Sequence, residues 1–254
     1  MKLGIIGCGA IGTDVAKAAD KMKEIENIYL FDINKAASDK LCKTVKKAKI
    51  KPVEEFLDDV DIAFEAASQQ AVIEYGVKIL ESGKDLVIMS IGSLFDDAFR
   101  KKMEDTARKN NCKIYLPSGA VCGIDGVLAA GIEKLDSVTL VTTKPPASLG
   151  KKVDKRTIIF EGSAREAVKQ FPKNINVAAC LSIAGVGFDE TKVEIVADPV
   201  ETRISHKILA HGNFGRLRAE VENMPNPNNP QSSYMASLSA IAVLKKIIDP
   251  IQIA

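Results

Sequence analysis

The sequence predicts an α/β protein in which a domain built on a parallel sheet is followed by an α+β domain built on a mostly antiparallel sheet. In the first half, short β-rich runs such as KLGIIG and VDIAFEA alternate with helical stretches, which is typical of a parallel sheet covered on both faces. From about Ser137 onward, strand-like runs with a two-residue period follow one another. GNFG separates the last two runs, which indicates a β-hairpin.

Three segments set the expected domain boundaries. The first domain is predicted over residues 1–118 and the second over 119–231. The run SYMASLSAIAVLKKII has apolar residues at helical spacing and predicts a final helix, at about 232–254, that returns to the first domain. Just before it, NMPNPNNPQSS reads as a polar connection outside the core, and near Lys46 the basic run KKAKIK reads as a solvated helix end.

The composition narrows the classes of partner. The 254 residues carry a net charge of +2 from interspersed Lys and Glu, which argues against nucleic acid as the partner. The five cysteines form no CxxC pair and no metal-site spacing, as expected in a reducing compartment. The chain enters a strand-like run at once, and no apolar run approaches the ~20 residues that span a bilayer. We therefore expect a cytoplasmic protein without a metal or a membrane partner.

The run GCGAIG points to a dinucleotide, because it follows a predicted strand and opens a predicted helix. Gly7 allows the tight turn, Gly9 lets the backbone approach a pyrophosphate, and Gly12 permits close packing of helix on strand. The helix N-terminus favours the phosphate charge. Asp32 ends the second strand, where its carboxylate can bind the ribose hydroxyls of NAD and repel a 2′-phosphate. The doubly wound Rossmann domain so predicted would bind NAD, with NADP possible, through Gly7, Gly9, Ala10, Ile11, Gly12 and Asp32.

Small and polar residues also follow the other predicted parallel strands, where ligands bind in open α/β sheets. They lie in AASQQ, in SIG and in PSGA, and FPKNINVAA adds two asparagines at a helix start. Ordinary loop chemistry, or helix capping by Asn174 and Asn176, explains these residues as well as cofactor binding does. The cofactor contacts proposed among them are Ala67, Ser68, Ser90, Ala120 and Asn176.

Both histidines lie in SHKILAHGNFG. Successive side chains of a strand point to opposite faces, so His206 and His211 should diverge, and we do not expect them to bind one metal ion together. His206 shares the more apolar face with Ile204, Ile208 and Ala210. At this point two readings stay open, a hydrogen-bonded core histidine and a general acid/base.

The motifs GCGAIG, PSGAVCGIDG, FPKNINVAA, ISHKILAHGNFG and ENMPNPNNPQSSYMASLSAIA together resemble the L-aspartate dehydrogenase family from end to end. The resemblance implies NAD(P)-dependent oxidation of L-aspartate to iminoaspartate, which hydrolyses to oxaloacetate and ammonia or feeds quinolinate and NAD synthesis. By position it assigns cofactor contacts to Ala120 and Asn176 and catalysis to His206. It also implies a homodimer, and a Rossmann domain that the C-terminal helix rejoins.

Two questions stay open on the sequence alone. The first is which cations hold the substrate carboxylates, for which the candidates are Arg156, Arg203, Lys207, Arg216 and Arg218. The second is the activity itself. A dihydrodipicolinate-reductase-like or homoserine-dehydrogenase-like enzyme would share the architecture, and a non-catalytic NAD(H) sensor is the alternative from another class.

Overall fold

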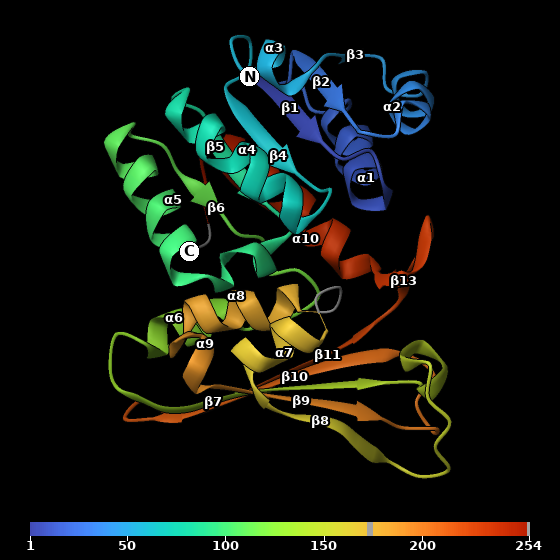
Figure 1. Ribbon diagram of the computed structural model, residues 1–254, viewed down its shortest axis with the longest axis vertical. Coiled ribbons are helices and arrows are strands. Elements are labelled where there is room, and N and C mark those ends of the chain that lie inside the picture. The colour runs from blue at the N-terminus through green and yellow to red at the C-terminus, as the bar shows by residue number, and fades with distance from the viewer. Residues whose placement is uncertain (172–174, 253–254) are drawn as a thin grey trace. The chain divides into compact units, whose positions relative to one another are not determined.

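A computed structural model describes residues 1–171 and 175–252 (Figure 1). The chain divides into two compact units. The first runs from Met1 to Pro117 and resumes at Ser237, and the second runs from Ser118 to Ala236.

The first unit is built on a six-stranded sheet in the order β3-β2-β1-β4-β5-β6, and every adjacent pair is parallel. The predicted parallel sheet is therefore confirmed. The strands alternate with helices, and the chain reverses its direction of strand addition between β1 and β4. The strands are β1 (Lys2–Ile6), β2 (Asn27–Phe31), β3 (Ala48–Ile50), β4 (Ile62–Glu65), β5 (Asp85–Ile88) and β6 (Ile114–Tyr115).

Helices connect these strands. The helix end that the sequence predicts near Lys46 is not found there. The basic run near Lys46 leads into the short edge strand β3, which pairs with β2 through Ile28, Tyr29 and Leu30. A three-residue strand is too short to show a period, which is why the sequence did not indicate it. The helices are α1 (Ala10–Ala19), α2 (Lys35–Cys42), α3 (Val53–Phe56), α4 (Gln69–Glu81), η1 (Ile91–Phe95), α5 (Asp97–Lys109) and α10 (Tyr234–Ile248).

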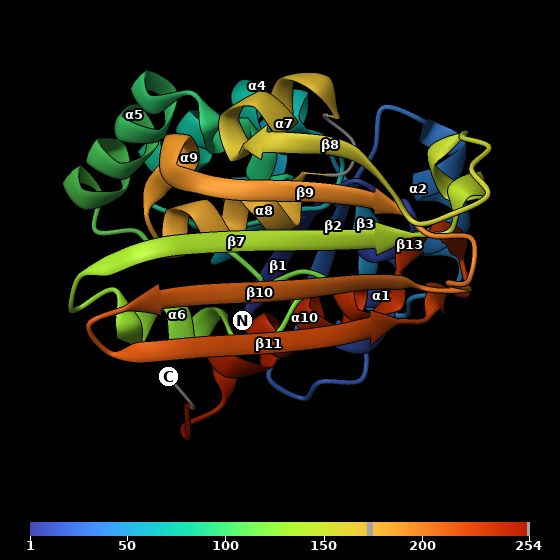
Figure 2. The same cartoon turned by 90° about the horizontal axis from the view of Figure 1, so that it is seen from below.

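The second unit holds a five-stranded sheet in the order β11-β10-β7-β9-β8, in which only β7 and β9 pair in parallel. Figure 2 shows this sheet face on, with the helices of the unit behind it. The mostly antiparallel sheet was predicted. Its elements are α6 (Ile124–Ala130), β7 (Leu135–Lys144), η2 (Pro146–Leu149), β8 (Thr157–Ser163), α7 (Ala164–Gln170), α8 (Asn176–Ala184), α9 (Gly187–Glu190), β9 (Thr191–Ala197), β10 (Ile204–Gly212) and β11 (Gly215–Asn223).

Local signals set the ends of several elements in this unit. The β10–β11 hairpin closes between Gly212 and Gly215, and Gly215 has a φ of +115°, which favours glycine. Ser163 and Glu166 form the predicted capping box at the start of α7.

The expected polar connection after β11 forms a small ribbon instead, of β12 (Pro225–Asn226) and β13 (Asn229–Ser233). Asn226 is fully buried, and its Oδ1 accepts hydrogen bonds from the backbone N–H groups of Asn228 and Asn229 at 2.7 and 3.2 Å. A buried asparagine therefore organises this turn, although its neighbourhood in the sequence is polar throughout.

No helix within the described part of the chain combines the length and the apolar character that crossing a bilayer requires.

Candidate functional site

The glycine turn between β1 and α1 has the geometry of a phosphate cradle. Gly7 adopts a φ of +101°, and a Cβ there would lie 2.7 Å from the backbone of Ala66 and Ala67. A Cβ on Gly12 would collide with the carbonyl oxygen of Gly7. A Cβ on Gly9, by contrast, would meet no atom within 4 Å. Packing therefore explains two of the glycines, whereas Gly9 leaves open space at the N-terminus of α1, where an anion is favoured.

Asp32 joins this turn to the end of β2. Its Oδ2 accepts a hydrogen bond from the backbone N–H of Cys8 at 2.7 Å, and its Oδ1 accepts one from Asn34 at 2.8 Å. Each carboxylate oxygen keeps a further lone pair for a ligand hydroxyl. Burial, and then the charge of Asp32, raise the pKa of the Cys8 thiol to about 12. Cys8 is therefore a buried, protonated thiol at neutral pH.

Glu65, at the end of β4, is a member of this region that sequence reasoning missed. Its side chain is 1% exposed, and burial raises its pKa although hydrogen bonds to the carboxylate oppose that shift. Oε1 accepts from the N–H of Ala67 and from the hydroxyl of Ser90, both at 2.8 Å. Oε2 accepts from the N–H of Ser90 at 2.9 Å. Glu65 therefore fixes the loops that carry Ala67, Ser68 and Ser90, all predicted cofactor contacts.

We expect Glu65→Gln to lower the melting temperature. Both carboxylate oxygens accept from N–H or O–H donors, and an amide would turn its NH₂ group toward one of those donors. An unsatisfied buried donor costs about 1–3 kcal/mol, which should exceed the gain from removing a buried charge. Thermal unfolding against Glu81→Gln, an exposed change on α4, checks this. A melting temperature at or above that of the wild type would show that the buried charge dominates.

In the second unit, His206 lies on the buried face of β10. His206, Ile208 and Ala210 are buried, whereas Leu209 and His211 are exposed. The predicted separation of the two histidines is confirmed. His211 lies 3.5 Å from an oxygen of Asp136 on the exposed face.

The imidazole of His206 is held in place by Thr142, its partner on β7, whose Oγ1 lies 2.9 Å from Nδ1. Burial, and then the charge of Lys144, lower the pKa of His206 to about 3. An unperturbed histidine side chain has a pKa of about 6.5. The imidazole is therefore neutral at pH 7, with an N–H on one ring nitrogen and a lone pair on the other.

Ala120 and Asn176 lie in this second unit. Ala120 is buried, and its carbonyl oxygen accepts a hydrogen bond from Nδ2 of Asn223 at 3.1 Å. Asn176 is the first residue of α8 and follows the N-cap Ile175, so the alternative in which Asn176 is the N-cap of this helix does not hold. Asn174 lies outside the described residues.

The five cations proposed for the substrate carboxylates do not gather at His206. Lys207 points to the other face of β10 and pairs with Glu220 at 2.9 Å. The alternation along β11 places Arg216 and Arg218 on that same outer face. The other two arginines are half-exposed and form ion pairs. Arg156 pairs with Asp198 at 3.5 Å, and Arg203 pairs with Glu222 at 3.8 Å.

Lys144, which was not among the predicted cations, lies near enough to His206 to affect its pKa. It is 7% exposed, and burial lowers its pKa. The period-two run from Val138 through Leu140 and Thr142 ends at Lys144 and could have found it.

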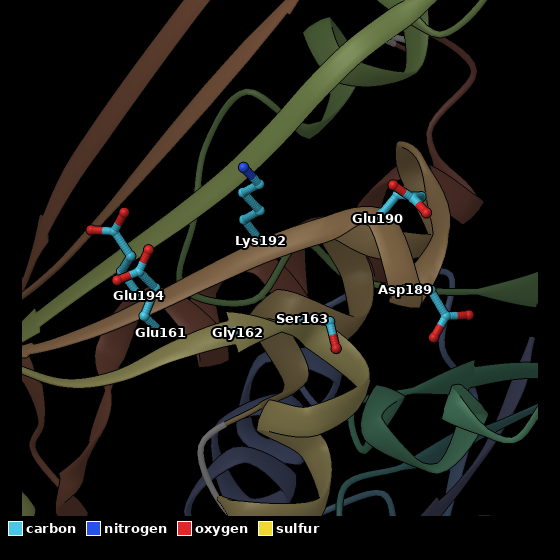
Figure 3. A pocket seen from close by; sticks show the side chains of 7 residues that line it. All are labelled: Glu161, Gly162, Ser163, Asp189, Glu190, Lys192 and Glu194. Atoms are coloured by element: carbon cyan, nitrogen blue, oxygen red, sulfur yellow. The ribbon is translucent and has the colours of Figure 1, made fainter.

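A surface hollow of about 420 Å³ in the second unit lies over β8, β9 and α9 and contains none of the predicted site residues. It is lined by four carboxylates, a lysine, Gly162 and Ser163. Figure 3 shows Glu161 and Glu194 side by side at one end, with Asp189 and Glu190 at the other. Over residues 1–171 and 175–252, no group of three or more His, Cys, Asp or Glu could hold a metal ion.

Two family models match the chain. Residues 125–247 match the model described as "Aspartate dehydrogenase, C-terminal". Residues 7–117 match "Homoserine dehydrogenase, NAD binding domain".

Relatives match over nearly their whole length. An L-aspartate dehydrogenase from Methanosarcina barkeri is 44% identical over 270 residues, covering 100% of this chain and 99% of the relative. One from Methanothermobacter thermautotrophicus is 39% identical over 254 residues, covering 100% and 98%. The crystal structure of aspartate dehydrogenase from Thermotoga maritima superposes with a TM-score of 0.84 at 30% identity, covering 100% and 99%.

Proposed function

The chain belongs to the L-aspartate dehydrogenase family, and from that membership we propose that it catalyses the NAD(P)-dependent oxidative deamination of L-aspartate. The Cα–N bond is oxidised to give iminoaspartate, whose hydrolysis yields oxaloacetate and ammonia. The observation that carries the proposal is His206, a buried and oriented imidazole within the segment that matches the aspartate dehydrogenase model.

The residues of the first unit fit a dinucleotide. Bound NAD⁺ supplies the acceptor for the hydride that leaves Cα. The open space at Gly9 admits a pyrophosphate, the N-terminus of α1 favours its charge, and Asp32 can accept hydrogen bonds from ribose hydroxyls. The first unit is thus the dinucleotide-binding domain and the second the substrate domain. The further proposed contacts are Ala10, Ile11, Ala67, Ser68, Ser90, Ala120 and Asn176.

His206 is the general acid/base of this proposal. We assign the tautomer in which Nδ1–H donates to Oγ1 of Thr142 across the 2.9 Å contact. This tautomer leaves a lone pair on Nε2. Nε2 can then take a proton from the water that attacks the imine carbon. The anionic substrate opposes the lowering of the His206 pKa and favours the imidazolium that forms.

Asp32 should set the choice of cofactor. A carboxylate at the end of β2 would face the extra phosphate of NADP, so Asp32→Ser should raise the ratio of kcat/KM for NADP⁺ to that for NAD⁺. The loss of its bond to Cys8 should also weaken both cofactors. Asp39→Ser, which removes an exposed charge from α2, is the matched control. A ratio unchanged from wild type would mean that the ribose is read elsewhere.

The activity is tested by following NADH at 340 nm. We expect NADH formation from L-aspartate, and NADH consumption with oxaloacetate only when ammonium is present. Homoserine and dihydrodipicolinate serve as alternative substrates for enzymes of the same architecture. NADH binding without turnover of any of these substrates would indicate a sensor instead.

We propose the oligomeric state and the cellular compartment from the family resemblance, the sheet edges and the cysteines. The family resemblance and the edge strands β8 and β11 of the second sheet favour a homodimer, since unpaired edges promote association. Light scattering in solution tests the dimer. Five free cysteines suit a reducing cytoplasm, and there the iminoaspartate can feed NAD synthesis.

A further inference from the structure

Four polar side chains lie at one end of the inner face of the second unit's sheet. Thr142 and Lys144 belong to β7, His206 to β10 and Asn223 to β11. His206 is registered with Thr142, and Asn223 with Ile204, two residues before His206. Alternation therefore puts all four on the same face. These residues are 6, 7, 7 and 3% exposed in the order named, so the cluster is largely shielded from water.

Asn223 presents an unused acceptor in this cluster. Its Nδ2 donates to the carbonyl oxygen of Ala120. A carbonyl can only accept, so this bond fixes which end of the amide is nitrogen. Oδ1 then points away from Ala120, and within the described part of the chain it has no hydrogen-bond partner. Buried carbonyl oxygens are normally paired, so this atom is suited to receive a donor from a ligand.

Lys144 places a positive charge on the strand next to His206, near enough to lower the pKa of the imidazole. Strand β10 lies between β7 and β11. His206 is thus on the strand between those that carry Lys144 and Asn223. A cation on one side and an acceptor on the other match the two kinds of group on an amino acid, a carboxylate and an amine.

We propose that Lys144 and Asn223 bind the substrate on either side of His206: the Lys144 ammonium pairs with a carboxylate of L-aspartate, and Asn223 Oδ1 accepts a hydrogen bond from its amino group. This rests on the proposed function for the identity of the substrate. Both are binding contacts that hold the reacting carbon beside the imidazole.

Succinate separates the two contacts, because it has both carboxylates of aspartate and no amine. Lys144→Met should raise the KM for L-aspartate and the inhibition constant of succinate by about 10–100-fold, as expected for a lost charge-assisted hydrogen bond. Lys144→Arg, which keeps the charge, should retain part of both affinities. Lys192→Met, an exposed change on the adjacent strand β9, should leave both constants unchanged.

Asn223→Leu should raise the KM for L-aspartate and leave succinate inhibition near wild type. Because this change also removes the bond to Ala120, Asn223→Asp provides the comparison. It keeps an acceptor for the amine and loses the donor, so it should bind L-aspartate better than Asn223→Leu. Equal impairment of both variants would mean that Asn223 only anchors Ala120, and would overturn its part of the proposal.

A readout without turnover distinguishes this proposal from the proposed function. Succinate should raise the melting temperature of the wild type and of Lys192→Met, and should not raise that of Lys144→Met. Protection of all three proteins alike would overturn the role of Lys144 even if the wild type oxidises L-aspartate. A wild type that succinate protects only through Lys144, but that does not oxidise L-aspartate, would retain the dicarboxylate site and refute the function. If Lys144→Met does not fold, Lys144→Gln, which also removes the charge, takes its place. Succinate inhibition and succinate protection equal to those of Lys192→Met would then count against the contact.

Discussion

His206→Asn should lower kcat for L-aspartate by about 10²–10⁴-fold, the usual contribution of general acid/base catalysis. NADH affinity should survive, because most proposed dinucleotide contacts belong to the first unit. Asparagine can keep a hydrogen bond to Thr142 but cannot take up a proton. Steady-state kinetics with NADH fluorescence titration measure both quantities.

His211→Asn is the matched control, since His211 is 51% exposed on the opposite face and faces Asp136. Its kcat should stay within several-fold of wild type. If His211→Asn were inactive and His206→Asn active, the face assignment would be reversed. If both were active, the proton would have to move through another group.

The same histidine should also make stability depend on pH. The folded pKa of about 3 lies below the ordinary value of 6.5, so the unfolded chain binds more protons between these values. Stability from neutral His206 is therefore full above pH 6.5 and is lost as the pH falls toward 3, by an amount on the order of a few kcal/mol. The drop in melting temperature from pH 7 to pH 4.5 should accordingly be smaller for His206→Asn than for the wild type.

Gly12→Ala and Gly9→Ala should fail in different ways. A Cβ on Gly12 collides with the Gly7 carbonyl, so helix α1 must move away from β1 and the melting temperature should fall steeply. Gly9→Ala meets no protein atom within 4 Å and should leave the melting temperature within a few degrees of wild type. It should nevertheless weaken NAD binding by an order of magnitude or more, because the added methyl group occupies the space proposed for the pyrophosphate.

Calorimetry and NADH titration on the two variants test this contrast. A Gly9→Ala protein that binds NADH normally would place the pyrophosphate away from this turn. A Gly12→Ala protein as stable as the wild type would show that α1 can shift at little cost.

The sequence was sufficient where periodicity or spacing is strong. Alternation along ISHKILAH put His206 on the buried face, the GCGAIG spacing gave the turn at α1, and Ser163 with Glu166 gave the start of α7. In each case one local rule determines the geometry, so distant parts of the chain are not needed.

It was insufficient where a residue depends on partners far along the chain. Glu65 is buried because the donors of Ser90 meet it across neighbouring strands, and nothing in IAFEAAS indicates that pairing. Asn223 depends on Ala120, 103 residues earlier. Lys144 is a different case. The alternation of β7 reaches it, but a lysine at a strand end more often lies in solvent, so the alternation alone does not predict that this one is buried.

The discontinuity of the first unit affects the order in which the protein can fold during synthesis. The second unit is complete once Ala236 has been made, whereas the first still lacks the segment from Ser237. At about 5–20 residues per second, the chain between Pro117 and that segment takes on the order of ten seconds to make. Throughout that interval the surface that later covers Ala240 and Leu244, both fully buried in the finished protein, has no helix against it. The first unit is therefore most prone to aggregate during this period of synthesis. In the same period a chaperone would find the most exposed apolar surface to bind.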